Sequence, residues 1–213
     1  MPGMLAEYAA FSRLVSGLSA DEWQTPSRCA TWSTADVAAH VVGQLTDVVS
    51  LRLDGLGLPE VTSRQVAERR GKAPKELAEE LESSVEIAST LGASFDDQSW
   101  NAPPPGSTVS TLGFGLEALW FDTYIHADDI RAAAGRTSVP GDGTLPSLSH
   151  ISQVLSDQGY APSELALDDM RPFAISGGGG QTITGAPFAF ILATTGRGDL
   201  DAFGLGDDPN IYR

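Results

Sequence analysis

Two of the three histidines lie in segments with strong helical periodicity, and their spacing suits metal binding. His40 falls on a stripe of residues three and four positions apart, which a helix turns toward its neighbours. Asp122 and His126 are four residues apart on another such segment, so their side chains project from adjacent turns toward one point. If the two helices face each other, the three side chains meet. The spacing therefore predicts one divalent metal ion held by His40, Asp122 and His126.

The predicted ligand set is open. Three N and O ligands leave at least one position for water or a substrate, as in catalytic rather than structural zinc sites. Zinc is the expected ion, and nickel suits the same ligands. Asp129, three residues after His126, is expected to orient that imidazole by accepting its second N–H. The spacing also fits a plain hydrogen-bonded i,i+4 pair, and a buried histidine is usually a core residue, so spacing alone leaves both interpretations open.

Cys29 is the only cysteine, which excludes an intrachain disulfide and a cysteine-rich zinc site. It precedes a predicted helix, whose N-terminal dipole would lower the pKa of a nearby thiol. A lone cysteine is nevertheless most often a small buried apolar residue, and this is the expectation for Cys29. A thiol that takes part in the chemistry is then either this one or one brought by a cosubstrate.

Apolar periodicity predicts a mainly α fold with a helical bundle over residues 1–136. Helices are expected at about 2–18, 33–53 and 111–135, with one long or two short helices at 61–91 and a break at 71–74. Residues 19–32 and 99–111 are expected to be connections, the second because it contains three consecutive prolines.

The C-terminal part has a different character and predicts a small α+β domain over residues 145–213. Residues 137–147 are rich in Pro, Gly and Ser, as a linker is. Helical spacing returns at 151–158, two short β-prone runs at 172–176 and 181–184 flank a run of glycines, and a last helix is expected at 187–195.

The net charge of −15, from 28 acidic and 13 basic residues, repels phosphate backbones and anionic lipids. We therefore expect no nucleic-acid partner and no membrane association. No apolar run reaches the roughly 18 to 20 residues of a membrane span, and the N-terminus lacks the features of a signal peptide, so a cytoplasmic location is expected. The composition does not choose between a monomer and a homodimer.

Two segments resemble the mycothiol-dependent maleylpyruvate isomerase family, relatives of the DinB-like four-helix bundles. They are "LSADEWQTPSRCATWSTADVAAHVVGQL" at 18–45 and "LWFDTYIHADDI" at 119–130. The residues that carry the resemblance are Trp23, Cys29, Trp32, Ser33, Asp36, His40, Asp122, His126 and Asp129. It implies that His40, Asp122 and His126 bind zinc, and that the metal activates the thiol of mycothiol, a low-molecular-weight thiol of actinobacteria. Asp122 stands where the family usually has Glu, so direct ligation and ligation through water are both open.

The C-terminal part resembles the family's small sterol-carrier-like domain, in which an apolar helix runs into a Gly-Arg pair. Here that segment is "FAFILATTGR", which ends at Arg197. The resemblance implies that Arg197 is catalytic and holds a substrate carboxylate, for which a guanidinium fork is suited.

The resemblance implies a metal- and mycothiol-dependent isomerase or thiol S-transferase that acts on a small electrophile, with a metal-activated thiolate as the nucleophile. Its partners would be this small-molecule substrate and the low-molecular-weight thiol. The alternative is a non-catalytic stress protein of the DinB-like fold that binds a metal or a small ligand. The short C-terminal part and the Asp at position 122 favour that alternative.

Overall fold

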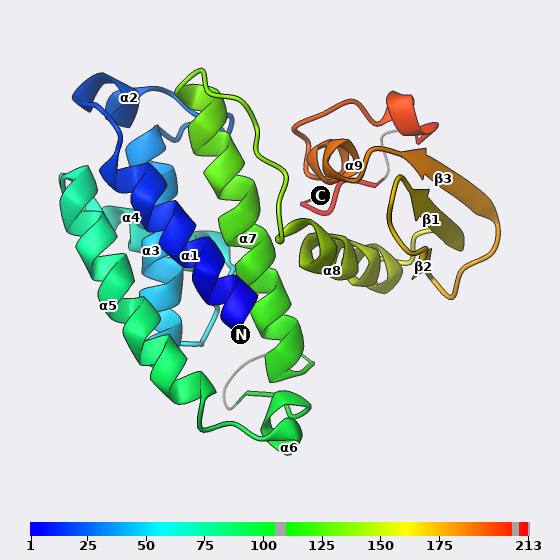
Figure 1. Ribbon diagram of the computed structural model, residues 1–213, viewed down its shortest axis with the longest axis horizontal. Coiled ribbons are helices and arrows are strands. Elements are labelled where there is room, and N and C mark those ends of the chain that lie inside the picture. Colours follow the sequence, from blue (N-terminus) through cyan, green and yellow to red (C-terminus); the bar gives the residue numbers. More distant parts are fainter. Residues whose placement is uncertain (105–109, 206–208, 213) are drawn as a thin grey trace. The chain divides into compact units, whose positions relative to one another are not determined.

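Four long helices build the first of the two units into which the chain divides, Met1–Val139 and Pro140–Arg213. The computed structural model describes residues 1–104, 110–205 and 209–212. The bundle helices are α1 (Pro2–Ser16), α3 (Thr34–Val49), α5 (Pro74–Gly92) and α7 (Leu112–Ala133). Both α1 and α3 pack against α5 and α7, which closes the bundle (Figure 1). The expected mainly α fold with a four-helix bundle is confirmed.

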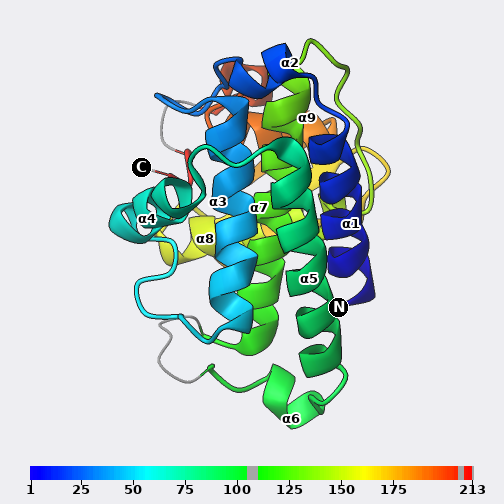
Figure 2. The same cartoon turned by 90° about the vertical axis from the view of Figure 1, so that its left-hand side faces the viewer.

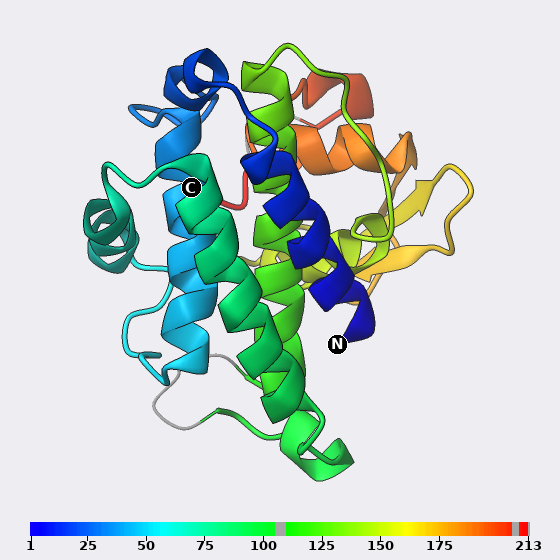
Figure 3. The same cartoon turned by 60° about the vertical axis from the view of Figure 1, so that its left-hand side comes forward.

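Shorter helices decorate the bundle. These are α2 (Ala20–Gln24), α4 (Pro59–Arg69) and α6 (Asp97–Trp100). Helix α4 packs along α3 on the side away from α1 (Figure 2 and Figure 3). The expected break after α4 is present at residues 70–73, where Gly71 has a φ of 87°. The expected connection at 19–32 contains α2, because Ser19 and Glu22 form a capping box that nucleates a short helix there.

Local signals in the sequence set where the two site-bearing helices begin. The Ser33 side chain accepts a hydrogen bond from the backbone N–H of Asp36, and the Asp36 carboxylate accepts one from the backbone N–H of Ser33. The Thr111 side chain caps α7 by accepting from the backbone N–H of Phe114. Helix α3 ends at Val49, a few residues before the expected end near residue 53.

The bundle core is apolar and fully enclosed, which makes α3 and α7 a rigid frame. Tyr8, Phe11, Val37, Leu81 and Ile130 have no exposed surface. Burying one such large apolar side chain stabilises a fold by about 1.5–3 kcal/mol. Polar side chains enclosed among these residues are therefore held in fixed positions.

The second unit is a three-stranded sheet with two helices. Its elements are α8 (Thr144–Asp157), β1 (Ser163–Leu167), β2 (Phe173–Ile175), β3 (Gln181–Gly185), α9 (Pro187–Thr194) and the 3-10 turn η1 (Asp201–Phe203). The strand order is β2-β1-β3, with β1 antiparallel to β2 and parallel to β3. Leu165 of β1 pairs with Phe173 and Ile183. Helix α8 packs on β2 and α9, which gives the expected small α+β part.

Three features of the chain differ from the expectations. Helix α8 begins inside the expected linker, because a proline in a first turn loses no helical hydrogen bond and Pro146 is tolerated there. Strand β1 was not expected, since its alternating sequence SELAL has no β-branched residue. The expected loop at 99–111 overlaps α6 and lies partly outside the described residues.

Among the helices that the structure describes, none is long and apolar enough to cross a membrane.

Candidate metal centre

His40, Asp122 and His126 meet where α3 faces α7. The Nε2 atom of His40 lies 3.3 Å from Asp122 Oδ2, and the Nε2 atom of His126 lies 3.5 Å from Asp122 Oδ1. The two imidazole centroids are 5.3 Å apart, with the rings nearly perpendicular. One ligand atom from each residue lies within 4.8 Å of the other two. The structure thus brings together the three side chains that the sequence singled out.

The cluster is largely shielded from solvent. The side chains of His40 and His126 are 7% and 8% exposed, while the Asp122 side chain keeps 17% of its surface. Among the described residues, none donates a hydrogen bond to the buried Asp122 Oδ2. A buried carboxylate oxygen without a donor is costly unless a positive charge satisfies it. This oxygen therefore indicates a cation position between the two imidazoles.

A carboxylate contacts His126 at Nδ1, the ring nitrogen that does not face Asp122. Its Nδ1 atom lies 2.9 Å from Oδ2 of the fully buried Asp129, whose Oδ1 accepts a hydrogen bond of 3.0 Å from Arg28 Nε. Because an ionised carboxylate only accepts hydrogen bonds, His126 Nδ1 carries the proton and Nε2 offers a lone pair. Asp129 thus has the contact expected of a residue that orients this imidazole.

An amide holds His40 in the same way. Its Nδ1 atom lies 2.9 Å from Oε1 of Gln65, a buried residue of α4. This oxygen is an acceptor, so His40 also carries its proton on Nδ1 and directs the Nε2 lone pair toward Asp122.

Two lone pairs and a carboxylate that converge in a buried space fit a divalent cation. The donor set, two imidazole nitrogens and a carboxylate, is one that zinc and nickel accept.

Without a cation, the negative charge of Asp122 favours a proton on the neighbouring imidazole. Burial opposes ionisation of Asp122, but the charges of His126 and His40 outweigh it and lower the pKa of Asp122. Burial likewise lowers the pKa of His126, but Asp122 and the hydrogen bonds with Asp129 and Cys29 raise it well above its usual value.

Cys29 lies beside this cluster rather than in the apolar core. Its side chain is half-buried, and Sγ lies 3.2 Å from Asp129 Oδ2 and 3.8 Å from His126 Nδ1. The expectation of a small buried apolar residue is confirmed only in part, because Cys29 packs against the apolar core but is half-buried, with its thiol on the rim of a polar site. Cys29, His126 and Asp129 form a second group with metal-ligand geometry, on the opposite nitrogen of the same imidazole.

Trp32 packs against both imidazoles. Its ring centroid lies 5.3 Å from that of His40 and 6.4 Å from that of His126. The indole precedes α3, where the Ser33 cap fixes the entry of the chain. It therefore shields one side of the cluster from solvent.

Arg197 belongs to the other unit. It follows α9, its Nη1 donates a 2.9 Å hydrogen bond to the carbonyl oxygen of Thr195, and its guanidinium carbon lies 5.8 Å from the centroid of the Tyr212 ring. Its predicted role in holding a substrate carboxylate stays a prediction.

Sequence reasoning missed the polar side chains around the imidazoles other than Asp129. Gln65 and Arg28 reach the site from α4 and from the segment before α3, outside the two helical stripes that carry His40, Asp122 and His126. The one available signal is that Gln65 lies on the buried stripe of α4, with Val66 and Arg69.

Comparison with known proteins agrees with this fold. The family model of the mycothiol maleylpyruvate isomerase N-terminal domain matches residues 4–131. The chain belongs to this family. Two crystal structures, of mycothiol-dependent maleylpyruvate isomerase and of a mutant with one histidine changed to alanine, share the fold with a TM-score of 0.60 each. They are 18% and 17% identical to the chain, over 92% of it and 88% of their own length. No curated protein sequence matches.

Proposed function

We propose that the chain is a metal-dependent enzyme that uses mycothiol, as an isomerase or thiol S-transferase on a small electrophilic substrate. The observation that carries the proposal is the convergence of two imidazole lone pairs and the buried Asp122 carboxylate on one point. Family membership and the names of the two solved structures, mycothiol-dependent maleylpyruvate isomerases, support the choice of thiol. Zinc is the proposed ion, and the cytoplasm the proposed location.

Each residue of the cluster has a proposed task. His40, His126 and Asp122 hold the ion, and Asp122 does so directly, because both of its oxygens face an imidazole nitrogen. When bound, the ion acts as a Lewis acid that makes a thiolate available at neutral pH. Asp129 keeps the His126 proton on Nδ1. Trp32 limits access of water to one side of the site.

The chemistry proposed for the cosubstrate is nucleophilic. The thiolate attacks an electrophilic carbon and either adds reversibly to a double bond, which permits isomerisation, or displaces a leaving group, which is S-transfer. Arg197 is proposed to bind a substrate carboxylate through its guanidinium fork. Protein groups thus bind and orient, while the small thiol supplies the reacting sulfur.

Elemental analysis and turnover with mycothiol test the proposal together. Protein purified without chelator should hold about one divalent ion per chain and should transform an electrophile only when mycothiol is present. The variant His126→Ala should lose both properties. His150→Ala, which removes the third histidine, on α8 of the other unit, is the matched control and should keep both.

Three results would reject this function. Wild-type protein without metal would show that the chain has no such metal site. A fully active His126→Ala variant would show that the ion has no role in turnover. If the metal is present but calorimetry gives no heat of mycothiol binding, the chain is instead a binding protein that does no thiol chemistry.

A further inference from the structure

A chain of buried polar contacts extends from His40 away from the proposed ion. His40 Nδ1 meets Gln65 Oε1 at 2.9 Å, and Gln65 Nε2 donates a 2.8 Å hydrogen bond to Asp47 Oδ2. We propose that Gln65 and Asp47 are positioning residues. Asp47 fixes the direction of the Gln65 amide, and this amide fixes the tautomer of His40 that can bind a metal. This inference rests on the metal site of the proposed function.

The two ends of the Gln65 amide are chemically different, and Asp47 decides which one faces His40. An ionised carboxylate only accepts hydrogen bonds, so it orients the amide NH₂ group toward itself. The amide oxygen must then face His40 and accept a hydrogen bond from its Nδ1–H group. A reversed amide would present its NH₂ group, move the imidazole proton to Nε2 and remove the lone pair that faces Asp122.

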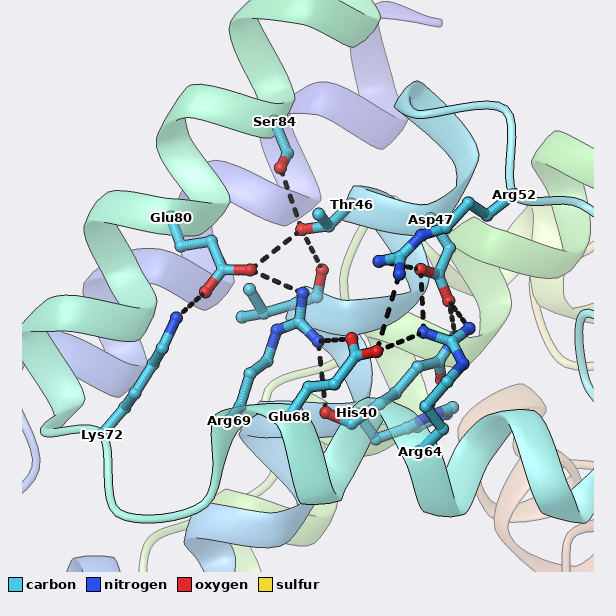
Figure 4. A network of polar contacts seen from close by, with 12 residues as sticks. His40, Thr46, Asp47, Arg52, Arg64, Glu68, Arg69, Lys72, Glu80 and Ser84 are labelled. Carbon is cyan, nitrogen blue, oxygen red and sulfur yellow. Dashed lines mark hydrogen bonds and ion pairs between the residues drawn. The ribbon is translucent and has the colours of Figure 1, made fainter.

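Two arginines hold Asp47 in its buried position. Its side chain has no exposed surface, and its oxygens lie 2.5 Å from Arg52 and 2.7 Å from Arg64 (Figure 4). Both guanidinium groups also form ion pairs with Glu68, and both arginine side chains are partly exposed. Charge-assisted hydrogen bonds of this kind offset the cost of burying the carboxylate. The Asp47 carboxylate, which orients the Gln65 amide, is thus held in place by two arginines.

The packing of α4 on α3 places Gln65 within reach of His40. Gly43, three residues after His40, lies directly under α4, and a Cβ there would come within 2.6 Å of Gln65 Cβ. The glycine lets the two backbones approach closely. With 1% of its surface exposed, Gln65 is enclosed between the helices, so water does not compete for its amide.

The first test replaces Gln65 by a side chain of similar length without polar groups. Zinc affinity is measured by competition with a chromogenic chelator, and the coordination geometry by the visible spectrum of the Co²⁺-loaded protein. Gln65→Met should bind zinc about 10- to 100-fold more weakly, with an altered Co²⁺ spectrum. Ser84→Ala is the control and should match the wild type. It also removes a buried polar group from the bundle, but Ser84 takes no part in the hydrogen bonds that join His40, Gln65 and Asp47.

A double variant supplies the rescue. In Asp47→Asn/Gln65→Glu the carboxylate and the amide exchange places, so an acceptor still faces His40 Nδ1 and the side-chain charge is unchanged. This variant should recover zinc affinity to within a few-fold of the wild type. Wild-type affinity in Gln65→Met, or a folded double variant that binds as weakly as Gln65→Met, would overturn the inference. Absence of zinc binding in the wild type would instead reject the proposed function.

Discussion

The two imidazoles of the candidate centre are supported in different ways. His126 is backed by the carboxylate of Asp129, three residues along the same helix, with Cys29 and Arg28 beside it. His40 is backed by the neutral amide of Gln65, 25 residues away on another helix. Both arrangements put the proton on Nδ1. The same tautomer is therefore reached once through local sequence and once through tertiary packing, and only His126 has a formally charged group in contact with its Nδ1 atom.

The largest effect is expected where both sides meet. Asp122→Asn keeps the size of the side chain but removes the charge that both Nε2 atoms face. Zinc affinity should fall by more than about 100-fold, beyond the range for residues that act behind a ligand. Competition with a chelator measures it. An unchanged affinity would show that the carboxylate does not bind the ion.

Asp129→Asn makes the His126 side resemble the His40 side. The amide oxygen of the variant can still accept a hydrogen bond from the Nδ1–H group of His126. The negative charge of the carboxylate is lost, however, and zinc affinity should fall by about 10- to 100-fold. Asp128→Asn is the matched control, because Asp128 is also buried and pairs with Arg28. The same chelator assay measures both variants. Equal losses in the two would mean that the effect comes from Arg28 rather than from the imidazole.

A smaller effect is expected from Gly43→Ala, which disturbs only the His40 side. The added methyl group must displace Gln65, so stability should fall by about 1–3 kcal/mol, and zinc affinity should fall less than in Gln65→Met. Denaturant unfolding and chelator competition measure these quantities. Gly113→Ala in α7 is the control, since its Cβ would make only ordinary contacts. A Gly43→Ala variant as stable as the wild type would contradict the close approach of α4.

Cys29→Ser should have the smallest effect. The serine hydroxyl can replace the thiol as a donor to Asp129, so zinc affinity should stay within about threefold of the wild type, as expected for a residue that is not a ligand. Equilibrium competition in the presence of a reductant is the measurement. A complete loss of zinc would favour the group of Cys29, His126 and Asp129 over the group on the other nitrogen.

The sequence predicted well what depends on local periodicity. The long helices follow from apolar spacing and from caps such as Ser33 and Thr111, and the convergence of Asp122 and His126 follows from one helical turn. Elements with weak local signals were missed, such as β1, whose pairing with β2 and β3 depends on tertiary contacts. Gln65 was missed for the same reason, since nothing in its own segment shows that it faces His40.

Anomalous diffraction at the zinc edge, from crystals of protein purified without chelator, would show directly whether the three side chains bind an ion. We expect one peak between the Nε2 atoms of His40 and His126, in contact with Asp122. A peak between Cys29, the Nδ1 atom of His126 and Asp129, or no peak at either position, would contradict this expectation.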